Sequence, residues 1–254
     1  MEIEFLGTGT STGIPQIKCQ CEVCKSNNPR DKRLRCSAVV RTGGLSLLID
    51  CGPDFREQIL RASSQELDAL LVTHSHYDHV GGVDDLRAYC QPSRFDIYAQ
   101  EDVLNDLRNR IPYCFKEHPY PGVPQFNLHA ITLEPFTIGD VLIEPLRVMH
   151  YKLPILGYKI GNMAYITDAK EVPDETIDKI RGIDTLIINA LRIEEHISHM
   201  SLSQSLATIA RIAPRRAFLI HLSHDMGLHD YVSQNLLPPG VEIAFDTQII
   251  TVAP

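Results

Sequence analysis

The sequence contains no tryptophan, and only 7% of its 254 residues are aromatic. It also lacks any apolar run approaching the roughly 18 residues that a membrane-spanning helix needs. Its first strand-like run begins too close to Met1 to be a signal peptide. Repeats and low-complexity tracts are missing as well, and collagen-like, coiled-coil and disordered classes are therefore excluded. We expect a cytoplasmic protein with no membrane partner.

Basic residues are also fewer than acidic residues. The 24 Lys and Arg residues are outnumbered by 32 Asp and Glu, and the formal net charge is −8. This balance argues against a surface that grips the phosphate backbone of a long nucleic acid. The seven cysteines are an odd number, which is a poor basis for a disulfide framework in a reducing compartment. With 11 histidines alongside them, metal binding becomes the first question.

Short apolar runs dominate both halves of the chain and predict a sheet-rich α+β fold. Helices are predicted over 102–110, 173–180 and 201–212, the last with Ser201 as its cap. Two packed sheets flanked by helices, in a single domain over residues 1–254, suit this pattern. A Pro-rich and aromatic loop over 113–126 has the length of a lid or a binding loop. The predicted strand runs are 3–6, 38–40, 45–49, 69–72, 96–99, 141–143, 146–149, 158–160, 163–166, 185–188, 217–220 and 241–245.

A Gly-rich loop over residues 7–13 follows the first strand. Such loops can cradle phosphate, but this one lacks both the Lys-Ser/Thr ending of a P-loop and the full dinucleotide-binding spacing. We therefore favour close backbone packing around a site over phosphate binding.

Four residues of metal-ligand type lie within six positions directly after the run 69–72. They are His74, His76, Asp78 and His79. In an extended or tightly turned segment, residues two apart project to the same side, so that His74 and His76 can chelate one metal while Asp78 and His79 face another.

Three more strand-like runs end in residues of the same kind. His150, Asp168 and His221 each follow an apolar run. With the first four they make seven candidate ligands, enough for two adjacent metals that share one carboxylate.

This ordered set resembles the metallo-β-lactamase superfamily, and Asp50 with Cys51 and Gly52 resembles that family's first motif. The resemblance implies an αββα sandwich with the metals at the strand ends. It assigns His74, His76 and His150 to one metal, and Asp78, His79 and His221 to the other, with Asp168 bridging them. Asp50 is expected to orient the ligands by accepting a hydrogen bond. Because true β-lactamases tend to have a cysteine where Asp168 stands, antibiotic hydrolysis is disfavoured.

A second cluster of metal-ligand types is formed by Cys19, Cys21 and Cys24, in a region with little apolar sequence. Zinc takes four ligands in structural sites, and His224, three residues beyond His221, is the best candidate for the fourth. We expect a Cys3His structural zinc in an N-terminal insertion at about 15–35. The alternative is a redox-active or merely exposed thiol cluster. Cys36, Cys51, Cys90 and Cys114 are interpreted as packing residues.

The cysteine cluster together with His221 and His224 resembles the PhnP group of phosphodiesterases. This resemblance implies hydrolysis of small cyclic phosphodiesters. A dinuclear centre supplies hydroxide near neutral pH, and His199 matches the position of a general-acid histidine in related phosphodiesterases and tRNase Z, with His196 as its rival. Asp78 and His199 are the predicted catalytic residues. Arg192 and, less strongly, Arg87 are candidates for pairing with phosphate oxygens.

The predicted cofactors are two divalent metals, manganese or zinc, in the active site and one structural zinc. Iron is compatible with the same ligands. The predicted partner is a small phosphodiester, and a homodimer stays open. Two other functions also stay open: a tRNA 3′-processing endonuclease, which the acidic charge opposes, and a non-catalytic metalloprotein of cofactor assembly like PqqB.

Overall fold

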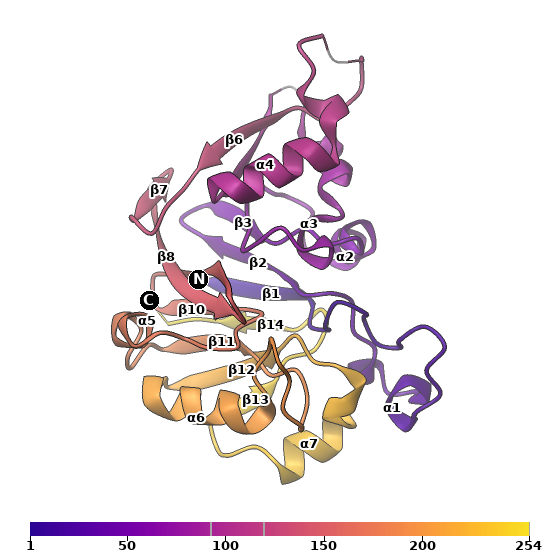
Figure 1. The fold of residues 1–254 in the computed structure, drawn as a ribbon, viewed down its shortest axis with the longest axis vertical. Helices are drawn as coiled ribbons and strands as arrows, with labels where there is room; N and C mark the ends of the chain where they lie inside the picture. The colour runs from indigo at the N-terminus through magenta and orange to yellow at the C-terminus, as the bar shows by residue number, and fades with distance from the viewer. Residues whose placement is uncertain (92, 119, 254) are drawn as a thin grey trace.

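Two mixed seven-stranded sheets pack against each other, and helices cover their outer faces (Figure 1). The computed structural model describes residues 1–91, 93–118 and 120–253. The first sheet has the order β14-β1-β2-β3-β4-β5-β6 and the second β13-β12-β11-β10-β9-β8-β7. The N- and C-termini lie side by side, where the backbone N–H of Val252 donates to the carbonyl of Met1 at 2.9 Å.

The first sheet is antiparallel from β14 to β3 and parallel from β3 to β6. The second is parallel from β13 to β10 and antiparallel from β10 to β7. The strands are β1 (Glu2–Gly7), β2 (Ser37–Thr42), β3 (Leu45–Ile49), β4 (Ala69–Leu71), β5 (Phe95–Ala99), β6 (Phe126–Ala130), β7 (Phe136–Ile138), β8 (Val141–His150), β9 (Leu153–Ile160), β10 (Met163–Ile166), β11 (Thr185–Asn189), β12 (Arg216–Ile220), β13 (Val241–Ile243) and β14 (Ile249–Thr251). The helices are α1 (Glu22–Lys25), α2 (Phe55–Arg61), α3 (Tyr77–Val80), α4 (Glu101–Arg110), α5 (Asp174–Lys179), α6 (Leu202–Ile212) and α7 (His229–Asn235), with 3-10 helices η1 (Pro29–Asp31), η2 (Val83–Tyr89), η3 (Pro112–Phe115) and η4 (His224–Met226).

Buried apolar side chains form three layers, because successive side chains along a strand point to opposite faces of its sheet. In β2, the side chain of Val40 joins the layer between the two sheets, whereas that of Val39 joins the layer under the helices of the first half. A third layer lies between the second sheet and α5, α6 and α7, and includes Ile188 and Ile209. Successive strand residues point to opposite faces, which is why these apolar runs serve two layers at once.

The three predicted helices are present as α4, α5 and α6, within a residue or two of the expected bounds. The runs 141–143 and 146–149 form one strand, β8, in which Pro145 faces Tyr158 of β9. Pro145 is tolerated there because β7 pairs only with Val141–Ile143, and the next backbone pairing that the described residues make on this side is the bridge between Met149 and Glu171. The loop over 113–126 begins within η3, and its Pro119 lies outside the described residues.

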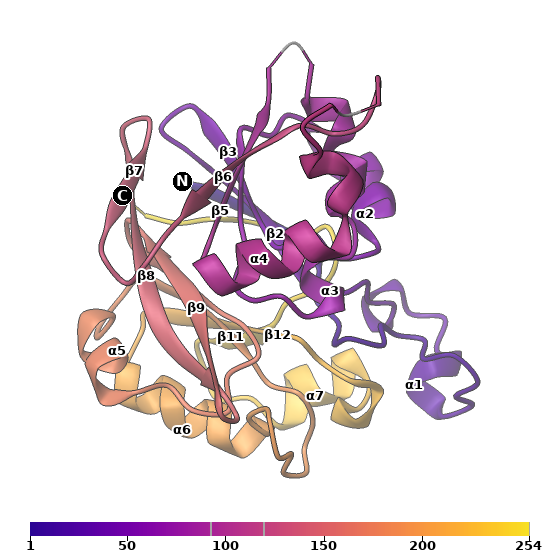
Figure 2. The same ribbon diagram turned by 45° about the horizontal axis from the view of Figure 1, so that its top comes forward.

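The N-terminal insertion leaves and re-enters the fold at one point, where Ile14 and Arg33 form an antiparallel bridge. Between them, α1 projects from the side of the molecule that carries α7 (Figures 1 and 2). Among the described residues, no helix is both long and apolar enough to cross a bilayer.

Candidate metal centres

The carboxyl ends of strands from both sheets converge on one cluster of histidines and aspartates. One group has its ligand atoms within 4.8 Å of one another and consists of His74, His76, His150 and Asp168. A second, on the same criterion, consists of Asp78, His79, His221 and Asp168. Asp168 belongs to both groups. The structure therefore brings together all seven residues that the sequence singles out at strand ends, with the carboxylate of Asp168 between the two sets.

The buried imidazoles present free nitrogen atoms to this cluster. The Nε2 atoms of His74, His79 and His221 are buried and have no hydrogen-bond partner within the described part of the chain. Such orphaned atoms are costly unless they bind something. Neutral imidazole nitrogen and carboxylate oxygen are suitable ligands for divalent metals, and the residues present thus fit two cations.

In His74, His79 and His150 the opposite ring nitrogen, Nδ1, makes a hydrogen bond that orients the imidazole. Nδ1 of His79 donates to Oδ2 of Asp50 at 2.7 Å, and Nδ1 of His150 donates to the carbonyl of Ser198 at 2.8 Å. Nδ1 of His74 donates to Oγ1 of Thr73, which in turn donates to Asp50. A proton on Nδ1 leaves the Nε2 lone pair free for a metal. Asp50 therefore has the orienting position expected from the sequence.

Backbone strain marks the same strand ends. Asp50, Asp168 and His221 have φ values of 59°, 55° and 57°. This left-handed region is sparsely populated by residues other than glycine, although Asn, Asp and His tolerate it best. Strain of this kind clusters at functional sites, and here it turns the chain sharply as each strand ends.

Charges inside the cluster stabilise one another. Burial alone would raise the pKa of Asp168, but His221 and His79 hold that pKa well below its usual range. Burial lowers the pKa of His74 well below its usual value, with His79 acting in the same direction. The centre therefore offers an ionised carboxylate at Asp168 and a neutral imidazole at His74. Burial acts to lower the pKa of His79, but Asp168, Asp50 and Asp78 raise it well above its usual value, so that a metal binding at His79 would displace a proton.

His199 lies against the shared carboxylate. Its Nε2 is 3.2 Å from Oδ2 of Asp168, and its ring stacks on that of His221 with centroids 5.0 Å apart. Burial lowers the pKa of His199 to about 4, although Asp168 acts to raise it. His196 contacts His199, with Nδ1 atoms 3.2 Å apart, and of the two it is His199 that contacts the candidate ligand Asp168. The geometry thus distinguishes the two rival histidines.

The three cysteines predicted to bind zinc form a separate group with His224. The ligand atoms of Cys19, Cys21, Cys24 and His224 lie within 4.8 Å of one another. Nδ1 of His224 is 3.4 Å from Sγ of Cys21, which also caps α1 by accepting from the N–H of Cys24. Three thiols and one imidazole are the donor set of a closed structural zinc site, and these residues fit that ion.

The predicted phosphate-binding residues are occupied elsewhere. The Arg192 guanidinium donates to the backbone carbonyls of Glu194 and Glu195, and Arg87 pairs with Asp84 on its own 3-10 helix. Both arginines therefore have structural partners. Sequence could not reveal those of Arg192, because backbone carbonyls carry no side-chain signal, whereas Asp84 stands three residues before Arg87 and is visible in the sequence.

The Gly-rich loop is a packing device, as the sequence favours. Its N–H groups at Gly9 and Thr10 donate to the carbonyls of Leu34 and Leu222. A Cβ at Gly7 would lie 2.0 Å from the carbonyl oxygen of Arg35. Leu222 directly follows the ligand His221, and the loop therefore supports the metal centre through the backbone.

Asp246 is a structural residue that the sequence analysis missed. Its carboxylate accepts from the N–H and Oγ1 of Thr8 and from the N–H of Leu34, and so ties the Gly-rich loop to the chain after β13. It follows the predicted run 241–245, so the same signal, an acid at the end of a strand, marks it in the sequence.

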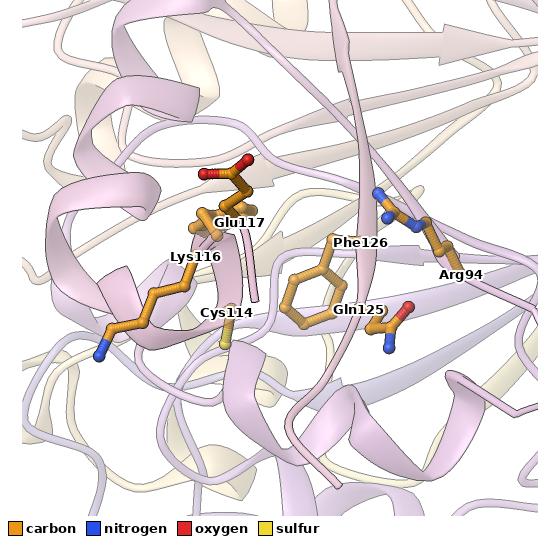
Figure 3. Close-up of a pocket in the computed structure, with 7 residues that line it drawn as sticks. Arg94, Cys114, Lys116, Glu117, Gln125 and Phe126 are labelled. Atoms are coloured by element: carbon orange, nitrogen blue, oxygen red, sulfur yellow. The ribbon is translucent and has the colours of Figure 1, made fainter. Parts of the chain in front are cut away.

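A pocket at the 113–126 loop is separate from both clusters (Figure 3). Arg94 and Lys116 bring positive charge to it, and the ring of Phe126 forms part of its wall. The loop also contacts η2, since the Tyr113 hydroxyl donates to Asp84. None of the residues that line this pocket belongs to the candidate ligand sets.

Comparison with known proteins agrees with this geometry. The family model described as "Beta-lactamase superfamily domain" matches residues 46–222. A solved diphosphatase from the PhnP family is 34% identical, with a TM-score of 0.91, over 98% of this chain and 97% of its own. The chain belongs to the metallo-β-lactamase superfamily and, within it, to the PhnP family. It is a metal-dependent hydrolase, and the predicted α+β fold is confirmed.

Two further relatives resemble the chain, one in structure and one in sequence. Zinc-bound PqqB from Methylobacterium extorquens covers 99% of this chain and 100% of its own at 19% identity, with a TM-score of 0.81, and shows the fold alone. A protein of Porphyromonas gingivalis named octanoyltransferase is 45% identical over 97% of this chain. The chain spans 50% of that relative's length.

Proposed function

We propose that this protein is a phosphodiesterase that hydrolyses small phosphodiesters, cyclic ones included, with two divalent metals, manganese or zinc. The observation that carries the proposal is the position of Asp168 in both ligand groups with His199 at 3.2 Å from it. When bound, two such cations neutralise phosphate charge and activate water for in-line displacement. The residues of the chain then have to orient the ester and protonate the leaving oxygen.

His199 is assigned the second task. Its Nε2 points toward Asp168, and its Nδ1 lies 3.0 Å from the Ser198 hydroxyl, so that the ring is held at both nitrogens. Burial disfavours the protonated ring, whereas an anionic phosphodiester beside it raises the His199 pKa and favours the proton. An imidazole in this position can donate a proton to a departing alkoxide. Asp78, the other predicted catalytic residue, is proposed to act as a ligand of the second metal.

The substrate is proposed to be small because the net charge of −8 disfavours a long polyanion. The structural zinc at Cys19, Cys21, Cys24 and His224 is proposed to hold the N-terminal insertion.

The test is turnover of 2′,3′-cyclic nucleotides and of bis(p-nitrophenyl) phosphate with manganese or zinc supplied. His199→Ala should lower kcat on the cyclic nucleotides by about 10²–10⁴-fold, the contribution of a general acid, with unchanged metal content. The loss should be smaller on the nitrophenyl ester, because nitrophenolate leaves without a proton. His196→Ala is the matched control and should retain most activity.

Three outcomes would overturn the proposal or part of it. Wild-type turnover by His199→Ala with metals bound would exclude the general-acid role. Full metal occupancy with no turnover of any diester would favour a carrier protein of the PqqB kind. Cleavage of a precursor tRNA in preference to the small diesters would favour the endonuclease.

A further inference from the structure

The turn between β8 and β9 places a strained aromatic residue beside the metal centre. His150 and Leu153 are cross-strand partners, and Tyr151 and Lys152 form the connection. Tyr151 has a φ of 55°. Two-residue hairpin turns that need positive φ at their first position use Gly, Asn or Asp there. A tyrosine therefore occupies a position where glycine would be less strained, and strain retained beside an active centre indicates a functional reason.

Three exposed apolar residues are linked to His150 by sequence, strand pairing or a neighbour's hydrogen bond, and we name them the apolar rim: Tyr151, Leu153 and Ile197. Their exposed fractions are 50%, 39% and 67%. Leu153 lies on the same face of the hairpin as His150, because directly paired strand residues share a face. Ile197 is kept near by its neighbour Ser198, whose carbonyl accepts from Nδ1 of His150 at 2.8 Å.

The Tyr151 ring is also close to a positive charge. The Lys152 ammonium lies 5.4 Å from its centroid. A ring that is half exposed, adjacent in sequence to a metal ligand and near a cation is suited to stacking a planar group that carries or adjoins negative charge. The ester phosphorus of a substrate at the metal centre would put its organic substituent within reach of this rim.

From this arrangement we infer that Tyr151 is a specificity-determining residue that stacks on an aromatic substituent, such as a nucleobase, of the phosphodiester, with Leu153 and Ile197 as apolar walls. The inference rests on the proposed phosphodiesterase function. It predicts selectivity for esters with an aromatic group over esters with a methyl group in the same position.

The experiment uses three diesters with the same leaving group: thymidine 5′-(p-nitrophenyl phosphate), bis(p-nitrophenyl) phosphate and methyl p-nitrophenyl phosphate. Tyr151→Ala should raise KM about tenfold for the two esters whose non-leaving substituent carries an aromatic ring, thymidine or nitrophenyl, as expected for the loss of one stacking contact. It should leave KM for the methyl ester and kcat for all three near wild type. Tyr151→Phe should behave like wild type. Tyr151→Gly should lose selectivity in the same way while raising Tm, because glycine relieves the turn.

A second readout does not depend on turnover. Because the chain has no tryptophan, Tyr151→Trp introduces a single indole, whose fluorescence should be quenched saturably by thymidine 5′-monophosphate and not by methyl phosphate. Equal losses on all three esters, or unchanged selectivity without quenching, would overturn the inference. Quenching in a protein that hydrolyses none of the diesters would instead reject the proposed function and leave the binding role of Tyr151 standing.

Discussion

Three of the candidate ligands, His74, His79 and His150, are held in orientation by a hydrogen bond at Nδ1. Asp50 is the most heavily used of these supports. It accepts from the N–H of Thr73 at 2.8 Å, from the Thr73 hydroxyl at 2.9 Å and from His79 at 2.7 Å. It is fully buried. A carboxylate with three donors in a dry environment stabilises both the ligand loop and the ring orientation of His79.

Asp50→Ala should therefore lower metal affinity about 10–100-fold, the usual effect of losing such a support. The site containing His79 should be affected first, because its ring would lose the acceptor on Nδ1. Metal content per chain after dialysis against graded chelator measures this. Asp96→Ala, at a half-exposed carboxylate that pairs with His129, is the control. Equal chelator resistance in the two variants would mean that Asp50 is not a support of the ligands.

Asp246 predicts a pH dependence of stability. Burial raises its pKa to about 6 from the ordinary value of 3.8. The folded protein thus binds a proton that the unfolded chain releases, and the free energy of unfolding should fall as pH rises between about 4 and 6. The shift corresponds to about 3 kcal/mol. In Asp246→Asn the fall over this window should be shallower, as measured by urea unfolding at a series of pH values. Parallel curves for the two proteins would contradict the assignment.

At the scale of elements, helix α6 is where sequence and structure agree best. Ser201 and Gln204 form a capping box, with Ser201 accepting from the Gln204 N–H and the Gln204 side chain accepting from the Ser201 N–H. Because this cap is a local feature, the start of the helix could be predicted from sequence. Ser201→Ala should cost about 1 kcal/mol, measured by thermal or urea unfolding. Ser203 is not a suitable control, because its hydroxyl lies 3.0 Å from that of Ser201. Ser233→Ala, at an exposed serine within α7, is the control, and equal losses in both variants would argue against the cap.

Other elements could not be predicted, because their stability is not local. Strands β6, β7 and β14 are short and lie at sheet edges, where a strand is defined by its neighbour more than by its own pattern. Helices α2 and α7 also went unpredicted. Pro145 divided β8 into two runs, although pairing with β9 carries the strand across it. The interval between the pairings of Ile143 and Met149, which permits this proline, exists only in the assembled sheet.

At the scale of the whole molecule, the packing of the two sheets brings the candidate ligands together, and their positions at strand ends made them predictable. They stand at the ends of β4, β8, β10 and β12, which belong to two sheets, and an apolar run that stops at His or Asp can be recognised in sequence. The contacts that surround these ligands could not be predicted from the sequence. Contacts such as those of Arg192 with backbone carbonyls and of His199 with Asp168 depend on how a loop folds back, and no residue pattern encodes that path.

The cysteine cluster joins residues near the beginning of the chain to residues near its end, as the pairing of β1 with β14 also does. Cys19 and His224 are 205 positions apart, and closing a loop of that length restricts the unfolded chain strongly. Asp31 reinforces the same junction by accepting from the N–H of His229. Two residues separate His221, a candidate ligand of the other centre, from His224 of the cysteine cluster.

Cys21→Ser should remove about one zinc per chain and lower Tm, because structural zinc contributes directly to folding. The two active-site metals should be retained at first, since none of their candidate ligands is a cysteine, and turnover per folded molecule should persist until the insertion unfolds. Elemental analysis beside thermal unfolding measures both effects. Cys90→Ala, at a buried cysteine outside the cluster, should lower Tm through packing alone and keep its zinc. Full zinc content in Cys21→Ser would show that these thiols do not hold the ion, and simultaneous loss of all metals would show that the two centres form one folding unit.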